Sequence, residues 1–218
     1  MLIDSEKSFR IRTSNSNVSV SIFPPPNQVV MTSGAAIRGQ QDGLFTKYNL
    51  VVDTNIEPSI TVSYELVQAE GPARKVPIGP AGVAMAPNEE GHFGNDTTWD
   101  NAAVYRVYLA AKPWRTPMIH NSLRVRYLGD CARVYVNGTL VQDSFYNGDE
   151  NFGMVIGVNR YEPIIFDSGF ELRILPLRAD APIYVVWPSF PEPGPGQSVV
   201  ELLGIDTLQT VDNTLIVN

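Results

Sequence analysis

The sequence has few of the residues that would indicate metal or disulfide chemistry. Cys131 is its only cysteine, so no internal disulfide can form, and its place beside Ala132 at the start of an expected strand favours a small buried residue over a reactive thiol. The two histidines, His92 and His120, have no histidine or cysteine partner at the spacing of a zinc site. Neither a Gly-x-Ser-x-Gly motif nor a phosphate-binding loop is present. These absences leave the sequence without a recognisable zinc, serine-hydrolase or nucleotide site.

Charged residues and long apolar runs are also scarce. Only 18 % of the 218 residues are charged, and the net charge of −7 argues against a nucleic-acid partner, which normally requires a basic patch. No apolar run approaches the roughly 20 residues of a membrane-spanning helix, so we expect no membrane partner. Hydrophobic residues make up 44 % of the chain, an ordinary value for a folded protein. The low charge is therefore not a sign of disorder.

Short strands separated by turn residues dominate the pattern, and no convincing amphipathic helix is present. Residues 9–13 and 18–23 alternate between apolar and polar side chains, and the Ser-Asn-Ser-Asn sequence between them predicts an N-terminal hairpin. Residues 69–101 are rich in Gly and Pro and have little periodicity, which is typical of a functional loop or of short strands that the pattern does not resolve. Further strands are expected over residues 44–52, 60–67, 104–110, 154–158, 170–175, 183–187, 199–203 and 215–217. About a dozen short strands predict an all-β antiparallel sandwich of jelly-roll type.

The most informative stretch is residues 123–148. Apolar side chains alternate with arginines over residues 123–127, which places Val125 on the buried face of a strand. Residues 134–136 then lead into Asn137-Gly138, the strongest short-range signal for a tight type I′ turn, and the next three residues return the chain. This stretch therefore predicts one strand followed by a hairpin.

The same stretch resembles the jelly-roll domains that accompany the catalytic barrel in family 35 glycoside hydrolases, the β-galactosidases. The resemblance rests on GD-x-A-x-V-Y-V-N-G…D-x-F-Y-N-G at residues 129–148 and on LPLR-x-D-A-P-I-Y at residues 175–184, and it is most specific over residues 100–187. It implies a jelly-roll or galactose-binding-like sandwich. The catalytic glutamates of that family lie on a (β/α)8 barrel, which needs roughly 250 residues, so no residue here is matched to them. We expect an accessory module that is not itself an enzyme.

The resemblance implies either of two tasks for such a module. It would bind galactose-containing glycans, or it would brace the catalytic barrel of a parent glycoside hydrolase without binding sugar. A hydrolase on the sandwich itself would need two carboxylates facing one cleft, and the sequence has no paired motif of that kind. The resemblance further implies a secreted or extracytoplasmic protein, although the sequence does not exclude a cytoplasmic one.

The expected domain organisation is one sandwich followed by a connector and a tail. The sandwich is predicted over residues 1–187, and the Pro/Gly-rich residues 188–196 are typical of an extended connector. Residues 197–218 still alternate in places. They are expected to add an edge strand, with a free linker as the alternative.

Aromatic and polar residues in the expected loops are the candidates for sugar binding. A sugar ring stacks its apolar face on an aromatic side chain, while its hydroxyl groups need planar donors and acceptors. Burial in the core is the alternative for each aromatic residue, and a ring that packs the turn is a specific alternative for Tyr146. The candidates are Trp99, Asp100, Asn101, Trp114, Arg115, Tyr146 and Asn147.

An oxygen-rich segment follows the predicted hairpin. Asp143, Asp149 and Glu150 are weak candidates for calcium ligands, because calcium prefers carboxylate and carbonyl oxygens. Their spacing matches no calcium-loop motif, so a solvated loop is the alternative, and no other cofactor is expected. Asp143 is also expected to form a cross-strand polar pair with Arg133.

Overall fold

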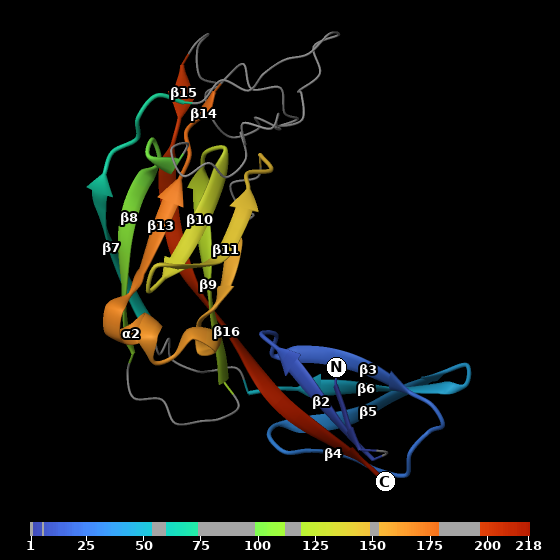
Figure 1. Ribbon diagram of the computed structural model, residues 1–218. Helices are drawn as coiled ribbons and strands as arrows, with labels where there is room; N and C mark the ends of the chain where they lie inside the picture. Colours follow the sequence, from blue (N-terminus) through green and yellow to red (C-terminus); the bar gives the residue numbers. More distant parts are fainter. Residues whose placement is uncertain are drawn as a thin grey trace, which may run out of the picture. The chain divides into compact units, whose positions relative to one another are not determined.

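The computed structural model describes residues 2–5, 7–53, 60–73, 99–111, 119–148, 153–178 and 197–218. These residues form mainly antiparallel strands with short helical turns, so the protein is an all-β sandwich, as the sequence predicts (Figure 1). No helix among the described residues is both long enough and apolar enough to cross a membrane.

The chain divides into two compact units, whereas the sequence predicts a single sandwich over residues 1–187. The first unit comprises Met1–Ser59, Lys112–Asn121 and Leu208–Asn218, and the second comprises Ile60–Ala111 and Ser122–Thr207. Each unit has its own cluster of buried hydrophobic side chains. Alternation along a strand specifies which face is buried but not which other strands cover it, so the sequence pattern could not separate the two cores.

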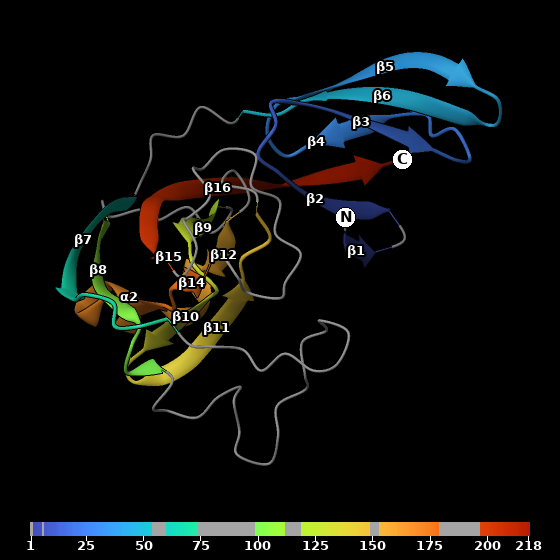
Figure 2. The ribbon, with the colours of Figure 1, turned by 90° about the horizontal axis from the view of Figure 1, so that it is seen from above.

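Two sheets enclose the core of the first unit. Ile11, Met31 and Leu215 come from one sheet and pack with Tyr48 and Leu50 from the other. The first sheet consists of β1 (Leu2–Ser5), β2 (Ser8–Thr13), the C-terminal part of β16 (Glu201–Val217) and β4 (Val29–Met31). The second sheet has the order β3 (Asn17–Ile22), β6 (Phe45–Val51) and β5 (Ala35–Asp42) (Figure 2).

The predicted N-terminal hairpin does not form. Its two strands exist as β2 and β3, but β2 pairs with β1 and β16, while β3 pairs with β6. The short connection between them carries the chain from one sheet of the first unit to the other. The apolar faces of β2 and β3 therefore meet across the core rather than lying side by side in one sheet.

The second unit is a larger sandwich. A five-stranded sheet has the order β11 (Thr139–Phe145), β10 (Cys131–Val136), β13 (Phe170–Ile174), β8 (Ala103–Ala111) and β7 (Ile60–Gln68). Facing it, β12 (Met154–Gly157) pairs with β9 (Ile119–Leu128), and β9 lies next to β16. The unit also contains the 3-10 helix η2 (Val158–Tyr161), the helix α2 (Ile164–Ser168) and a small ladder of β14 (Leu177–Arg178) with β15 (Ser198–Val199).

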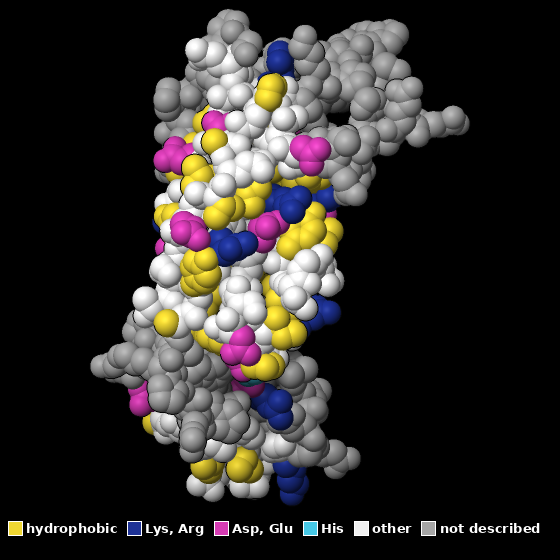
Figure 3. All heavy atoms as spheres, turned by 60° about the vertical axis from the view of Figure 1, so that its left-hand side comes forward, with side chains coloured by type: hydrophobic (Ala, Val, Ile, Leu, Met, Phe, Trp, Pro, Cys, Tyr) yellow, Lys and Arg dark blue, Asp and Glu magenta, His cyan; other side chains and the backbone are white. Residues whose placement is uncertain are grey.

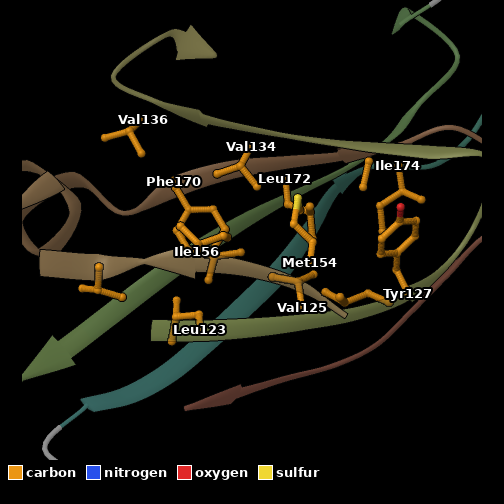
Figure 4. Close-up of a cluster of buried hydrophobic side chains, with 14 of the residues drawn as sticks. Leu123, Val125, Tyr127, Val134, Val136, Met154, Ile156, Phe170, Leu172 and Ile174 are labelled. Atoms are coloured by element: carbon orange, nitrogen blue, oxygen red, sulfur yellow. The ribbon is translucent and has the colours of Figure 1, made fainter. Parts of the chain in front are cut away.

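The core of the second unit lies between these sheets. Side chains of β10 and β13, such as Val134 and Leu172, point toward those of β9 and β12, such as Val125 and Ile156 (Figure 4). Val134, Leu172 and Val125 are completely buried. The alternation at residues 123–127 therefore identified the buried face of β9 correctly.

The hairpin predicted at Asn137-Gly138 is confirmed. Strands β10 and β11 are antiparallel, with Val136 opposite Thr139. Asn137 and Gly138 have φ angles of 49° and 74°, the positive values that a type I′ turn requires at both central positions. The local sequence was sufficient here, because Asn and Gly tolerate this backbone region at low cost.

The C-terminal tail forms a strand, but its position differs between the two units. In the first unit β16 is an interior strand, since β2 and β4 pair with its opposite edges at Leu215 and Ile216. In the second unit it lies beside β9 at the end of the strand order. The expectation of an edge strand is therefore wrong for the first unit. The connector predicted at residues 188–196 lies outside the described residues.

Candidate functional site

The outer face of the five-stranded sheet of the second unit is polar. Because successive side chains of a strand point to opposite faces, the residues that alternate with the buried ones on β10 and β13 lie on this side. They include Arg133, Tyr135, Glu171 and Arg173. Basic, acidic and hydrophobic side chains are interspersed on the part of the surface that Figure 3 presents, without a large patch of one charge.

An open pocket of about 300 Å³ lies on the second unit. It brings together residues from three separate parts of the chain, including two of the predicted sugar-binding residues. Strand β7 contributes Gln68, and β13 contributes Glu171 and Arg173. The remaining lining residues are Val67, Trp99, Asp100 and Val104.

Hydrogen bonds and an aromatic contact hold the polar side chains of this pocket in place. Arg173 Nε donates to Glu171 Oε1 at 2.6 Å, and the guanidinium carbon lies 4.9 Å from the ring centroid of Tyr135. The Gln68 amide nitrogen donates to the carbonyl oxygens of Asp100 at 2.8 Å and of Ala102 at 3.1 Å. The pocket therefore offers oriented donors and acceptors of hydrogen bonds, which is what recognition of a polar ligand requires.

Trp99 is not the exposed aromatic platform that sugar stacking would require. Its relative exposure is only 4 %, and it packs with Ala102, Cys131 and Leu175. The Arg133 guanidinium carbon lies 4.2 Å from the centroid of the indole ring. The polar neighbours of Trp99 in the sequence suggested a loop, but contacts from distant strands bury the ring.

The other predicted sugar-binding residues that the structure describes, Asn101, Tyr146 and Asn147, are not among the residues that line this pocket. The backbone carbonyl of Asn101 accepts a hydrogen bond from the Gly71 amide at 3.0 Å, which ties the segment after β7 to the segment before β8. Tyr146 is buried in the core beside Tyr127, with ring centroids 6.0 Å apart, so the packing alternative describes it. Asn147 follows Tyr146 and is exposed. Trp114 and Arg115 lie outside the described residues.

The calcium candidates are only partly described. Asp143 is exposed on β11, directly opposite Arg133 of β10, so the register agrees with the predicted cross-strand pair. Asp149 and Glu150 lie outside the described residues. Within the part of the chain that the structure describes, no three His, Cys, Asp or Glu side chains come together as a metal site would require.

Cys131 is buried, as its sequence position predicts. Burial, together with the negative charges of Asp130 and Asp143, raises the pKa of the Cys131 thiol to about 11. The thiol is therefore protonated near neutral pH and is a poor nucleophile.

Two ion-pair clusters lie outside the pocket. In the first unit, Asp212 accepts hydrogen bonds from Arg12 Nε at 2.7 Å and lies 2.8 Å from His120 Nε2. The hydrogen bond from Arg12 holds the pKa of Asp212 below its ordinary value. In the second unit, burial alone would raise the pKa of Asp206, but hydrogen bonds from Arg126 and Arg124 outweigh burial and lower it.

Sequence reasoning did not select Gln68, Glu171 and Arg173 as site residues. The one available signal was the alternation over residues 170–175, which places Glu171 and Arg173 on the same face of a strand. Nothing in the sequence indicated that this face borders Trp99 and Asp100.

The fold and the pocket together define an all-β sandwich protein with a polar pocket on one sheet. No family model matches the chain, and no curated protein or solved structure matches it.

Proposed function

We propose that the protein is a non-catalytic carbohydrate-binding module and that the polar pocket of the second unit holds a galactose-containing glycan. The observation that supports this function best is the convergence of Gln68, Asp100, Glu171 and Arg173 around one open space of about 300 Å³. Sugar hydroxyl groups both donate and accept hydrogen bonds, and these side chains supply partners of both kinds. The choice of galactose, of a parent β-galactosidase-like enzyme and of an extracytoplasmic location rests on the resemblance to family 35 glycoside hydrolases.

Hydrogen bonding is the main mode of recognition in this proposal. Arg173 is held by Glu171 and Tyr135 before a ligand arrives, so less side-chain entropy is lost when it binds. The carboxylate of Asp100 accepts hydrogen bonds from hydroxyl groups. Trp99 contributes the wall of the pocket rather than a stacking surface, because Arg133 lies over its ring.

Calorimetric titration with galactose and with β-galactan oligosaccharides tests this function. We expect a Kd on the order of 0.1–10 mM, because the ligand is small and partly exposed to solvent. Arg173→Gln and Asp100→Asn should each weaken binding about tenfold, the loss expected for one hydrogen bond to a charged group.

Arg106→Gln is the matched control. Arg106 lies opposite Glu171 in the same sheet but does not line the pocket, so its loss should leave affinity unchanged. Absence of binding to every galactan, or an equal loss of affinity with Arg106→Gln, would contradict the proposed function.

A second candidate function is a structural domain that braces a catalytic barrel. It is favoured by β7, which lies at the edge of the five-stranded sheet and exposes Tyr64 and Leu66 by 46 % and 53 %. An edge strand with exposed apolar side chains is normally covered by another surface. The barrel of a parent glycoside hydrolase would supply that surface.

Sedimentation velocity of the isolated chain tests the bracing function. An uncovered apolar edge should cause association as concentration rises, and Leu66→Lys should suppress it without lowering the melting temperature. A chain that stays monomeric at high concentration while it binds galactan would rule this candidate out.

A further inference from the structure

The first unit contains a second open pocket, which has a different chemical character. Its volume is about 230 Å³, and Ser21 is the only polar residue among the described residues that line it. Two of the lining residues, Ile11 and Leu215, belong to the buried core of the first unit and are exposed by only 7 % and 2 %. The other apolar residues around the pocket include Val20, Ile22, Phe23 and Phe45.

Two aromatic side chains at this pocket are about half exposed to solvent. Phe23 is exposed by 56 % and Phe45 by 47 %, although the buried residues Ile11 and Leu215 line the same space. The two ring centroids are 5.7 Å apart, and the ring planes are tilted by 56°. Tilted rings at this separation attract one another through their edges and faces, and they leave other edges and faces available to a third ring.

We infer that this pocket binds a small uncharged molecule that contains a single aromatic ring. Its described lining has no charged side chain, so a charged ligand would lose its hydration without gaining a partner. An apolar cavity of about 150 Å³ is large enough to bind benzene, so this pocket has room for one ring with a small substituent. Since Ser21 is the only polar residue in the described lining, the ligand needs at most one hydrogen-bonding group.

The aromatic character of the ligand follows from Phe23 and Phe45. A ring that joins this pair gains edge-to-face contacts that a saturated ring of the same size does not make. Binding would also remove the two exposed phenylalanine rings from water, which supplies the main driving force. This inference is independent of the proposed carbohydrate site, because its residues all belong to the first unit.

Titration of the whole chain with p-cresol, followed by two-dimensional amide NMR, tests the inference. We expect saturable shifts at Ile11, Val20 and Leu215 with a Kd on the order of 0.1–1 mM. 4-Methylcyclohexanol has a similar shape without aromaticity and should bind about fivefold more weakly. Benzoate has the ring with a charge and should bind at least about tenfold more weakly.

Substitutions at the two exposed rings provide the second test. Phe23→Ala and Phe45→Ala should each raise the Kd for p-cresol about tenfold, the effect of losing a large apolar contact. Leu44→Ala is the matched control, because Leu44 is 68 % exposed beside Phe45 but does not line the pocket. Val20→Phe fills the pocket and should abolish binding, and its melting temperature reports whether the fold is intact.

Three results would overturn the inference. The first is a titration in which p-cresol causes no saturable shift at residues of the pocket. The second is equal affinity for 4-methylcyclohexanol, which would exclude an aromatic preference. The third is a loss of affinity for p-cresol in Leu44→Ala as large as that in Phe45→Ala, which would indicate non-specific binding to the protein surface.

Discussion

Arg133 lies over the indole ring of Trp99, with its guanidinium carbon 4.2 Å from the ring centroid. The two residues are far apart in the sequence: Arg133 lies on β10, whereas Trp99 precedes β8, and β13 separates these two strands in the sheet. This contact covers the aromatic face on which a sugar would otherwise stack. It therefore changes Trp99 from a candidate binding platform into a structural residue at the wall of the polar pocket.

Trp99→Ala should act mainly on stability. The ring is buried, so its removal leaves a cavity and should lower the free energy of unfolding by about 3–5 kcal/mol. Arg133→Ala removes the cation–π contact with Trp99 and the packing of the Arg133 stem, and should cost about 1 kcal/mol. Urea denaturation measures both effects. A Trp99→Ala variant of unchanged stability would show that the ring is exposed in solution.

Val125→Asp should prevent the second unit from folding. Val125 is completely buried between the two sheets, and an unpaired carboxylate there would cost more than about 4 kcal/mol. Val155→Asp is the matched control, because Val155 is 50 % exposed on the neighbouring strand β12 and the same change should cost less than about 1 kcal/mol. Circular dichroism during heating distinguishes the two variants. Similar melting temperatures for the two variants would show that Val125 does not lie on the buried face of β9.

Gly138→Ala should weaken the β10–β11 hairpin. Gly138 has a φ angle of 74°, a conformation that costs a residue with a side chain about 1–2 kcal/mol. Gly157 offers a control, since its φ is −76° and an added Cβ would meet no atom within 4 Å. Gly157→Ala should therefore be close to neutral. Chemical denaturation of Gly138→Ala and Gly157→Ala tests the assignment of the turn. Equal free energies of unfolding for the two variants would refute it.

Acid should destabilise the first unit through Asp212. Its pKa is below the ordinary value in the folded protein, chiefly because of the hydrogen bond from Arg12. A carboxyl group with a lowered folded pKa stabilises the fold above its unfolded pKa near 4, and this contribution is lost as the pH falls through the folded pKa. Asp212→Asn should cost about 1–2 kcal/mol at pH 7, a low value for a charged hydrogen bond because Arg12 is half exposed.

Denaturation between pH 2 and pH 7 measures this contribution. The difference between the native protein and Asp212→Asn should shrink toward zero in acid. A constant difference across this range would mean that the carboxylate charge is not what stabilises the unit.

The purified chain should not hydrolyse aryl β-galactosides. Asp100 and Glu171 both line the polar pocket, but Glu171 is bound to Arg173 at 2.6 Å, which suits a positioning role better than proton transfer. Release of nitrophenol from an aryl β-galactoside should equal the rate without protein. Turnover that disappears in Glu171→Gln would make the protein an enzyme and overturn this expectation.

Local patterns in the sequence were sufficient for the class of the fold and for several details. The alternation at residues 123–127 identified Val125 as a core residue, and Asn137-Gly138 fixed the turn of a hairpin. The position of Cys131 at a strand start predicted its burial. Each of these features depends on neighbours in the sequence, through the period of the strand or the backbone freedom of a turn residue.

Tertiary structure decided which strands pair and which side chains are neighbours in space. The pattern of β2 and β3 is that of a hairpin, yet the two strands lie in opposite sheets because their apolar faces are buried against each other. The burial of Trp99 depends on Arg133, Cys131 and Leu175, which only strand pairing brings to it. The composition and strand period of this protein thus determined an all-β sandwich. Its division into two cores and the sets of residues that line its pockets arose from long-range strand pairing, which local periodicity does not encode.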